Sequence, residues 1–199
     1  MEFYRQTSQY TGAASSFLMA MHQLKPESFP LDREQEFRLW MRTANLPTRS
    51  SSIYGLALVA KEEGVPVKLV VGEKEYDYPD YRFKRYRKVE VDEAKYSSKL
   101  YAKRARANNI RIEEREFELA EVRELLKEGK LIILRVNAGI FRERSATSKY
   151  VVVEGFEKGQ YIVMDPEQGE MRVDDNVMQE AFDTLVTKKK RDHRMIVLG

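Results

Sequence analysis

The chain has 199 residues, with 35 Lys and Arg against 32 Asp and Glu, a formal net charge of +3, and no cysteine. The lack of cysteine excludes disulfides, thiolate zinc sites, iron–sulfur clusters and a cysteine nucleophile. The two histidines, His22 and His193, are too few for a three-histidine metal site, and no nucleotide or flavin motif is present. We therefore expect no metal and no cofactor.

Length and composition favour one folded domain over residues 1–199, since disordered chains are poor in aromatic residues and this chain has 11%. The first residues, MEFYRQTSQ, lack the apolar core of a signal peptide. No apolar run approaches the roughly 20 residues of a membrane span. We therefore expect a cytoplasmic protein with no membrane partner. High charge without cysteine is also a pattern seen in heat-adapted proteins.

The first third of the chain predicts helices. Apolar residues between Phe17 and Leu24 recur at helical spacing, so a buried helix begins near Gly12, with Thr11 or Gly12 as its capping residue. Asp32 is the expected N-cap of a second helix. A third helix follows three serines and ends at Gly64.

After Gly64 the pattern becomes mixed, with alternating strands between shorter helices. Strands are predicted over 65–72, 86–91, 110–117, 131–136, 150–156, 161–165 and 195–198, and helices over 92–107, 119–127 and 174–186. The strands at 150–156 and 161–165 form a hairpin turned at 157–159. Because helices come first and antiparallel strands dominate later, the predicted class is α+β rather than a doubly wound sheet.

The segment from Tyr81 to Arg106 holds ten Lys or Arg against three acids, a net charge of +7 that leaves −4 for the rest of the chain. Cations interleaved with tyrosines can follow phosphates and stack on bases, which makes nucleic acid a second partner to consider. A solvated basic face is the commoner origin of such a run. The candidate nucleic-acid-binding residues are Arg82, Lys84, Arg85, Arg87, Lys88, Lys103, Arg104 and Arg106.

Three stretches follow one another as in a known peptidase family. Residues 5–21 read RQTSQYTGAASSFLMAM, where that family has a Gln before a TCGPA-type segment and an apolar helix. KYVVVEGF at 149–156 and YIVMDP at 161–166 match its His before an aromatic residue and valines, and its strand ending in Asp-Pro. From about Tyr4 to Leu198 the chain thus resembles the bacteriocin-processing (double-glycine) peptidase-like family. The resemblance implies the papain-like cysteine peptidase fold.

The resemblance also implies a site at four positions. Gln6 aligns with the family's oxyanion Gln and Asp165 with the carboxylate that orients its histidine. Gly12 stands where the family has its cysteine, and Lys149 where it has its histidine. Glycine has no attacking atom, and lysine at its usual pKa of about 10.4 is a poor base near neutrality. We therefore expect an inactive peptidase-like protein that binds a peptide or protein partner in the remnant cleft, with a Lys149–Asp165 salt bridge shaping it.

Other interpretations stay open. Ser15 and Ser16 share the helix that begins at Gly12, so a residual hydrolase or acyltransferase could use a Ser–Lys pair with Lys149. They lie three and four residues beyond Gly12, roughly 5 Å along the helix axis, and first-turn serines more often cap backbone N–H groups. Lys149 also fits an exposed strand end, and Asp165 before Pro166 a strand-ending turn.

Overall fold

The computed structural model describes residues 1–73, 86–143, 145 and 147–199. Within these ranges the helices are α1 (Gly12–Leu24), α2 (Arg33–Thr43), α3 (Ile53–Glu62), α4 (Lys88–Ala107), α5 (Leu119–Lys127) and α6 (Asp175–Thr187). The strands are β1 (Ala44–Asn45), β2 (Ser50–Ser51), β3 (Val67–Val71), β4 (Arg111–Glu114), β5 (Leu131–Asn137), β6 (Ser148–Glu157), β7 (Gln160–Asp165), β8 (Gly169–Asp174) and β9 (Arg194–Leu198).

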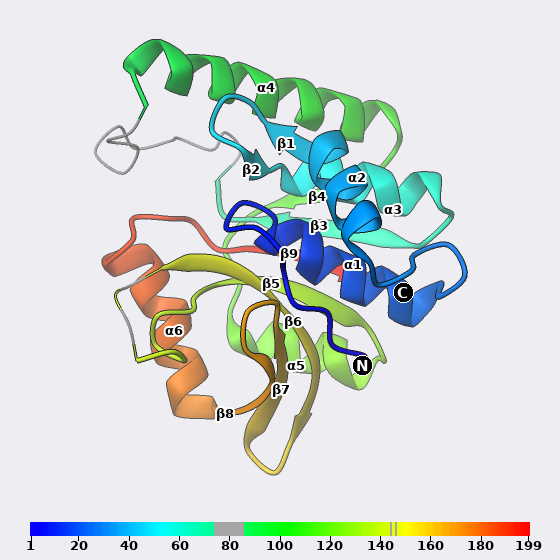
Figure 1. Ribbon diagram of the computed structural model, residues 1–199. Helices are drawn as coiled ribbons and strands as arrows, with labels where there is room; N and C mark the ends of the chain where they lie inside the picture. Colours follow the sequence, from blue (N-terminus) through cyan, green and yellow to red (C-terminus); the bar gives the residue numbers. More distant parts are fainter. Residues whose placement is uncertain (74–85, 144, 146) are drawn as a thin grey trace.

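Seven of the strands form one sheet in the order β4-β3-β9-β5-β6-β7-β8 (Figure 1). The β3–β4 pair is parallel and the other pairs are antiparallel. The hairpin predicted at 150–165 is present as β6 and β7. Helices and a mostly antiparallel sheet confirm the α+β class.

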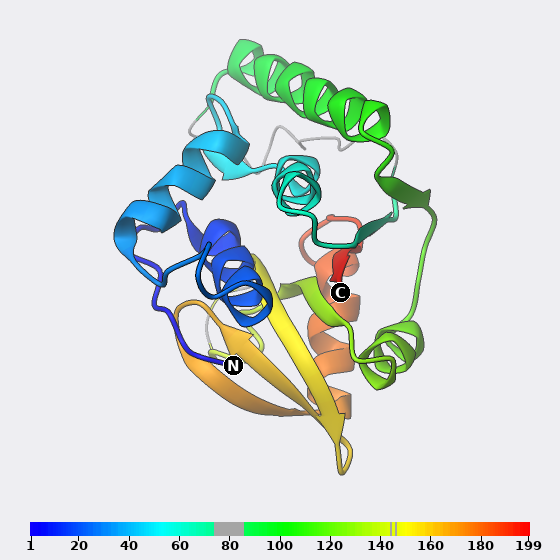
Figure 2. The same cartoon turned by 90° about the vertical axis from the view of Figure 1, so that its right-hand side faces the viewer.

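Two apolar layers lie on opposite faces of the sheet because side chains alternate along each strand. In β5, Ile133 points to the face covered by α1 and α3, whereas Ile132 and Leu134 point to the face covered by α5 and α6. Figure 2 shows α5 and α6 on the side of the sheet away from α1. The sheet thus forms the middle layer of the molecule.

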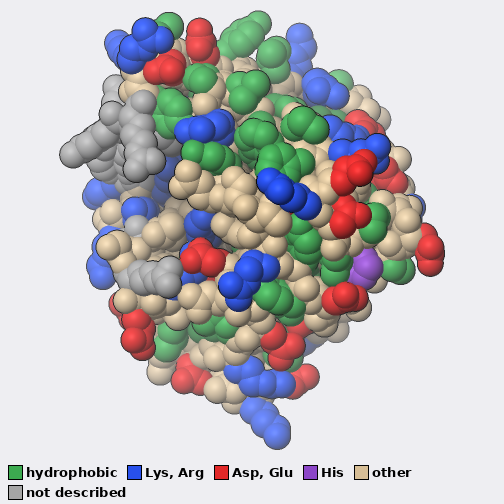
Figure 3. All heavy atoms as spheres, viewed as in Figure 1, with side chains coloured by type: hydrophobic (Ala, Val, Ile, Leu, Met, Phe, Trp, Pro, Cys, Tyr) green, Lys and Arg blue, Asp and Glu red, His purple; other side chains and the backbone are tan. Residues whose placement is uncertain are grey.

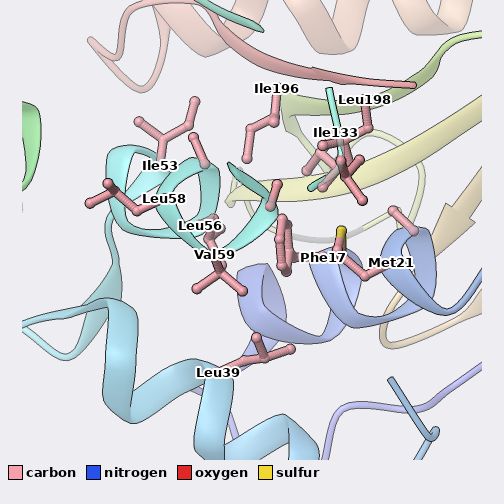
Figure 4. Packing of buried hydrophobic residues seen from close by; sticks show 14 of the residues in the cluster. Phe17, Met21, Leu39, Ile53, Leu56, Leu58, Val59, Ile133, Ile196 and Leu198 are labelled. Atoms are coloured by element: carbon pink, nitrogen blue, oxygen red, sulfur yellow. The ribbon is translucent and has the colours of Figure 1, made fainter. Parts of the chain in front are cut away.

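Helix α1 is the centre of the larger layer. Phe17, Leu18, Met19, Ala20 and Met21 are all fully buried, since α1 has the sheet on one side and α2 and α3 on others. Figure 4 shows Phe17 and Met21 reaching toward Ile133 and Leu198. Being covered all round explains why this helix is apolar on every face. The packing of α1 on all sides also fixes the position of its N-terminal tip.

The caps of these helices are only partly as predicted. The Asp32 side chain accepts the Gln35 N–H at 2.8 Å, so the predicted N-cap of α2 is confirmed. Thr11 is the N-cap residue of α1, but its hydroxyl donates to the Ser8 carbonyl at 2.9 Å instead of capping the helix. The first N–H groups of α1 therefore have no side-chain cap.

The strand predicted over residues 86–91 is wrong, because α4 already begins at Lys88. The reason is a local cap: the Arg87 backbone N–H donates to the Glu90 carboxylate at 2.7 Å. Strand β8 and the short pair β1–β2 were not predicted. In the described ranges, no helix combines the length and the apolar character needed to cross a membrane.

Candidate functional site

Gly12 opens α1 at the point where the preceding loop, the helix and strand β6 meet. A Cβ built on Gly12 would lie 2.8 Å from Oε1 of Gln6 and 3.7 Å from Nζ of Lys149. The Gln6 N–H donates to the Pro166 carbonyl at 2.8 Å, which ties the loop to the end of β7 beside Asp165. The structure therefore brings the four predicted positions into one neighbourhood.

Asp165 is fully buried and belongs to a different ion pair from the one expected. The Arg142 guanidinium donates to both of its carboxylate oxygens, from Nη2 to Oδ1 at 2.6 Å and from Nε to Oδ2 at 3.1 Å. The Glu167 N–H adds a bond at 2.7 Å. The predicted Lys149–Asp165 salt bridge is therefore wrong: a planar, two-pronged guanidinium occupies the carboxylate in its place.

Lys149 lies in β6 opposite Val136 of β5, and its side chain is half-buried. Among the residues that the structure describes, none forms a hydrogen bond or an ion pair with its ammonium. Burial lowers the pKa of Lys149, and the nearby charge of Arg142 lowers it further, while the Glu167 and Asp165 carboxylates offset only part of this. The ammonium thus lies near Gly12, and no carboxylate in the described ranges pairs with it directly.

A cavity of about 240 Å³ opens beside Gly12. It lies between the start of α1, the β1–β2 loop, and strands β5 and β6. Its lining consists of Gln9, Tyr10, Gly12, Ala13, Thr48, Arg49, Ser50, Ser51, Arg135, Ser148, Lys149, Tyr150 and Arg191. Four of these side chains are cationic, and none of those in the described ranges is acidic. The cavity therefore suits a ligand with negative charge or many hydrogen-bond acceptors.

A family model described as the Peptidase_C39 like family matches residues 1–198. The chain belongs to the Peptidase_C39 like family. The comparison with curated proteins gave no significant match.

Two solved structures share this architecture along the whole chain. A double glycine motif protease from an AMS/PCAT transporter, solved in complex with the leader peptide, has 14% identity and a TM-score of 0.51. The match covers 100% of this chain and 91% of that one. A C39-like peptidase from Bacillus anthracis has 11% identity and a TM-score of 0.53, with coverage of 100% and 94%. These neighbours support the papain-like fold that the Peptidase_C39 resemblance implied.

The two alternative nucleophiles lie inside this Peptidase_C39 fold, away from the cavity lining. Ser15 and Ser16 are both fully buried. The Ser15 hydroxyl donates to Glu36 at 3.0 Å, and the Ser16 hydroxyl donates to the Tyr150 carbonyl at 2.8 Å. Both hydroxyls are therefore committed to structural hydrogen bonds.

Sequence reasoning missed Glu36, a fully buried carboxylate that fixes the loop before α1. It accepts the Thr7 N–H and the Tyr4 hydroxyl, each at 2.9 Å, as well as Ser15. Burial raises the pKa of Glu36, but the hydrogen bonds that the carboxylate accepts, those from Thr7 and Tyr4 among them, outweigh burial and lower it overall. The sequence did hold a signal for its burial: Glu36 lies three residues before Leu39, so the two share one face of α2, and that face is buried.

Arg142 was also missed, because only the fold brings it to Asp165, 23 residues along the chain. Arg135 was visible as the one charge in an apolar strand. The structure buries it in a bridge to Asp192 at 3.1 Å, where Asp192 also accepts from Arg194 at 2.7 Å. In the described part of the chain, no group of three His, Asp or Glu side chains is placed to hold a metal ion.

The basic segment is mostly helix α4, and its charges follow the helix dipole. Acids occupy the first turns and cations the later ones, an order that stabilises an isolated surface helix. Arg87 pairs with Glu90 and Arg106 with Glu114, while Lys88, Lys103 and Arg104 are exposed. Figure 3 shows blue, red and green side chains interspersed along the upper edge, where α4 runs. Arg82, Lys84 and Arg85 lie outside the described residues.

Proposed function

We propose that this member of the Peptidase_C39 like family is catalytically inactive and binds an extended peptide in the cavity beside Gly12. The observation that carries the proposal is the meeting of Gly12, Gln6 and Lys149 at the tip of α1. The chain has the fold of its peptidase-like family, yet it has no cysteine to act as the nucleophile. A structural neighbour bound to a leader peptide supports peptide as the class of ligand.

Calorimetry with a panel of ten-residue peptides, some ending in Gly-Gly, tests this proposal. Ala13 lines the cavity, so Ala13→Trp would fill it and should abolish binding. Ala120→Trp is the matched control, because Ala120 is exposed on α5, on the other face of the sheet. Equal affinity of the wild type and Ala13→Trp, or no binding by either, would overturn the proposal.

Catalytic inactivity needs its own measurement. Each peptide is incubated with the protein at equimolar concentration for a day and analysed by mass spectrometry. We expect intact peptides, because neither Gly12 nor the buried Ser15 and Ser16 offers an accessible nucleophile. Cleavage that disappears in Ser15→Ala or Ser16→Ala would instead establish the Ser–Lys hydrolase.

Binding of nucleic acid through α4 stays a separate prediction. It rests on the exposed cations Lys88, Lys103 and Arg104. Phosphate contacts release counterions, so true binding would fall steeply with salt, and Lys103→Ala would lower the slope by about one. No RNA or DNA shift at low salt would exclude it.

A further inference from the structure

The cavity beside Gly12 concentrates positive charge. Arg49, Arg135, Lys149 and Arg191 all line it, and they come from four separate segments of the chain. Arg135 is neutralised by Asp192, which lies behind the lining. Arg49 is held over the Tyr10 ring at 3.9 Å, which orients it along the cavity wall. Like charges gathered in a partly buried space repel one another, so an anion between them would be favoured.

The pKa values of two of these groups are lowered, which indicates that their charged forms are costly in this cavity. Burial and the Arg142 charge lower the pKa of Lys149, whose ammonium has no ion pair within the described ranges. Burial also lowers the pKa of Arg191 to about 10, with Arg194 adding to the effect and Asp192 opposing it. A bound anion would reverse these effects and favour the charged forms.

Two buried polar atoms, one beside Gly12 and one on a residue that lines the cavity, have no hydrogen-bond partner among the described residues. They are Oε1 of Gln6, which faces Gly12, and Oγ of Ser51. The Ser51 hydroxyl can donate, and so can the Gln6 amide if it turns over, giving up its bond to the Ser8 carbonyl. The uncapped first turn of α1 adds backbone N–H groups at the same end. Hydrogen-bond donors are therefore available beside Gly12 and elsewhere in the cavity lining.

The volume of the cavity fits the end of a chain better than a long segment of it. At about 240 Å³ it is smaller than the roughly 300–1,000 Å³ of drug-sized pockets. A smaller pocket of about 70 Å³ lies next to it, because the two share Arg135, Tyr150 and Arg191 in their linings. The cavity has room for the last residues of an extended peptide rather than for a long segment of it.

We propose that the cavity binds the C-terminal carboxylate of the peptide, with Lys149 and Arg49 as its main cationic partners and Gly12 leaving the space for it. The inference rests on the proposed function, because it names the part of the peptide that the same site recognises. It makes the site a receptor for free chain ends rather than for internal segments.

The experiment compares the hexapeptide Ala-Ala-Leu-Ala-Gly-Gly as a free acid and as a C-terminal amide, by calorimetry at one ionic strength. We expect the free acid to bind at least tenfold more tightly than the amide. Lys149→Met should reduce this preference to less than threefold, and Lys149→Arg should restore most of it. Lys61→Met removes an exposed charge on α3 and should change nothing. Circular dichroism of each variant checks that the fold is kept.

A third arm measures the rise in melting temperature caused by inorganic phosphate against chloride. If the acid and the amide bind equally and Lys149→Met has no effect, peptide binding stands and the carboxylate inference fails. If neither peptide binds but phosphate raises the melting temperature of the wild type and not of Lys149→Met, the cavity takes free anions, and both proposals for peptide fail. If none of the three probes acts, the cavity is no binding site.

Discussion

At the scale of single residues, the proposed function implies that the site differs from an active peptidase in two side chains, in electrostatics as well as in chemistry. On that proposal Gly12 stands where the attacking group would be, and Lys149 puts a cation where a neutral base would be needed. Asp165, although present, is held by Arg142, whose side chain is only 4% exposed. Restoring one residue would therefore not restore the pairing that a peptidase requires.

Gly12→Cys tests whether positions 12 and 149 are neighbours, and it introduces the only thiol of the chain. Its Cβ would lie 3.7 Å from Nζ of Lys149, and the clash with Gln6 involves only the end of a flexible side chain. A nearby cation and a helix N-terminus both stabilise the thiolate, so the thiol pKa should fall about one unit or more below its usual 8.5. The pH dependence of alkylation by iodoacetamide measures it.

Lys149→Met in the Gly12→Cys background is the control for this measurement. Loss of the cation should raise the thiol pKa again, because only the helix terminus then favours the thiolate. If the thiol pKa is 8.5 or higher and Lys149→Met does not change it, positions 12 and 149 are not neighbours. That result would also remove the basis of the proposed cavity.

Arg142→Met probes the buried ion pair. Removing the guanidinium leaves the fully buried carboxylate of Asp165 without its counter-ion, so the free energy of unfolding should fall by about 3–5 kcal/mol. Urea unfolding followed by circular dichroism measures the change. Arg172→Met, which breaks an exposed pair with Glu157, should cost less than about 1 kcal/mol. Similar losses for both variants would mean that Arg142 and Asp165 are not a buried pair.

At the scale of elements, Glu36 joins the N-terminal segment to α1 and α2, and this contact should depend on pH. The pKa of Glu36 is lowered in the folded state, so its contribution is present above the unfolded value of about 4.3 and is lost as pH falls through the folded value. Glu36→Gln should cost about 1–3 kcal/mol at pH 7, because several donors lose a charged acceptor.

The check is urea unfolding at pH 7 and at pH 3. The difference between the wild type and Glu36→Gln should shrink at the lower pH, where the wild-type carboxyl also approaches neutrality. Glu34→Gln, an exposed change two residues away on α2, should show little difference at either pH. A Glu36→Gln deficit that is the same at both pH values would exclude a charged carboxylate in this network.

At the scale of the whole molecule, the sequence predicted what depends on local pattern. Helix α5 was predicted at 119–127 and is found there, and β6 and β7 form the predicted hairpin. Strand β8 was missed because it lies at the edge of the sheet, where Glu170 and Arg172 dilute its apolar residues. Strand order and the parallel β3–β4 pair join distant segments, and local periodicity carries no signal for them.

The candidate site follows the same division between local and distant information. A family resemblance predicted the four positions, because a family pattern relates residues that are far apart in the sequence but close in the fold. They are Gln6, Gly12, Lys149 and Asp165. The partner of Asp165 and the other cations of the cavity were not predicted, because only the fold brings their segments together. The charge of Arg135 inside an apolar strand was the one local sign of the buried cationic wall.

That residues 1–199 form one domain stays a prediction, and cooperative unfolding tests it. Both apolar layers share the same sheet, so losing one should expose the other, and the two should unfold together. Fluorescence of Trp40, the only tryptophan, reports the layer of α2, whereas far-ultraviolet circular dichroism reports all elements. Met178 is fully buried in α6 on the opposite face, so Met178→Ala should lower the free energy of unfolding by about 2–5 kcal/mol. The urea midpoints seen by fluorescence and by circular dichroism should then fall by the same amount. A Trp40 midpoint that does not move with Met178→Ala would divide the chain into two folding units.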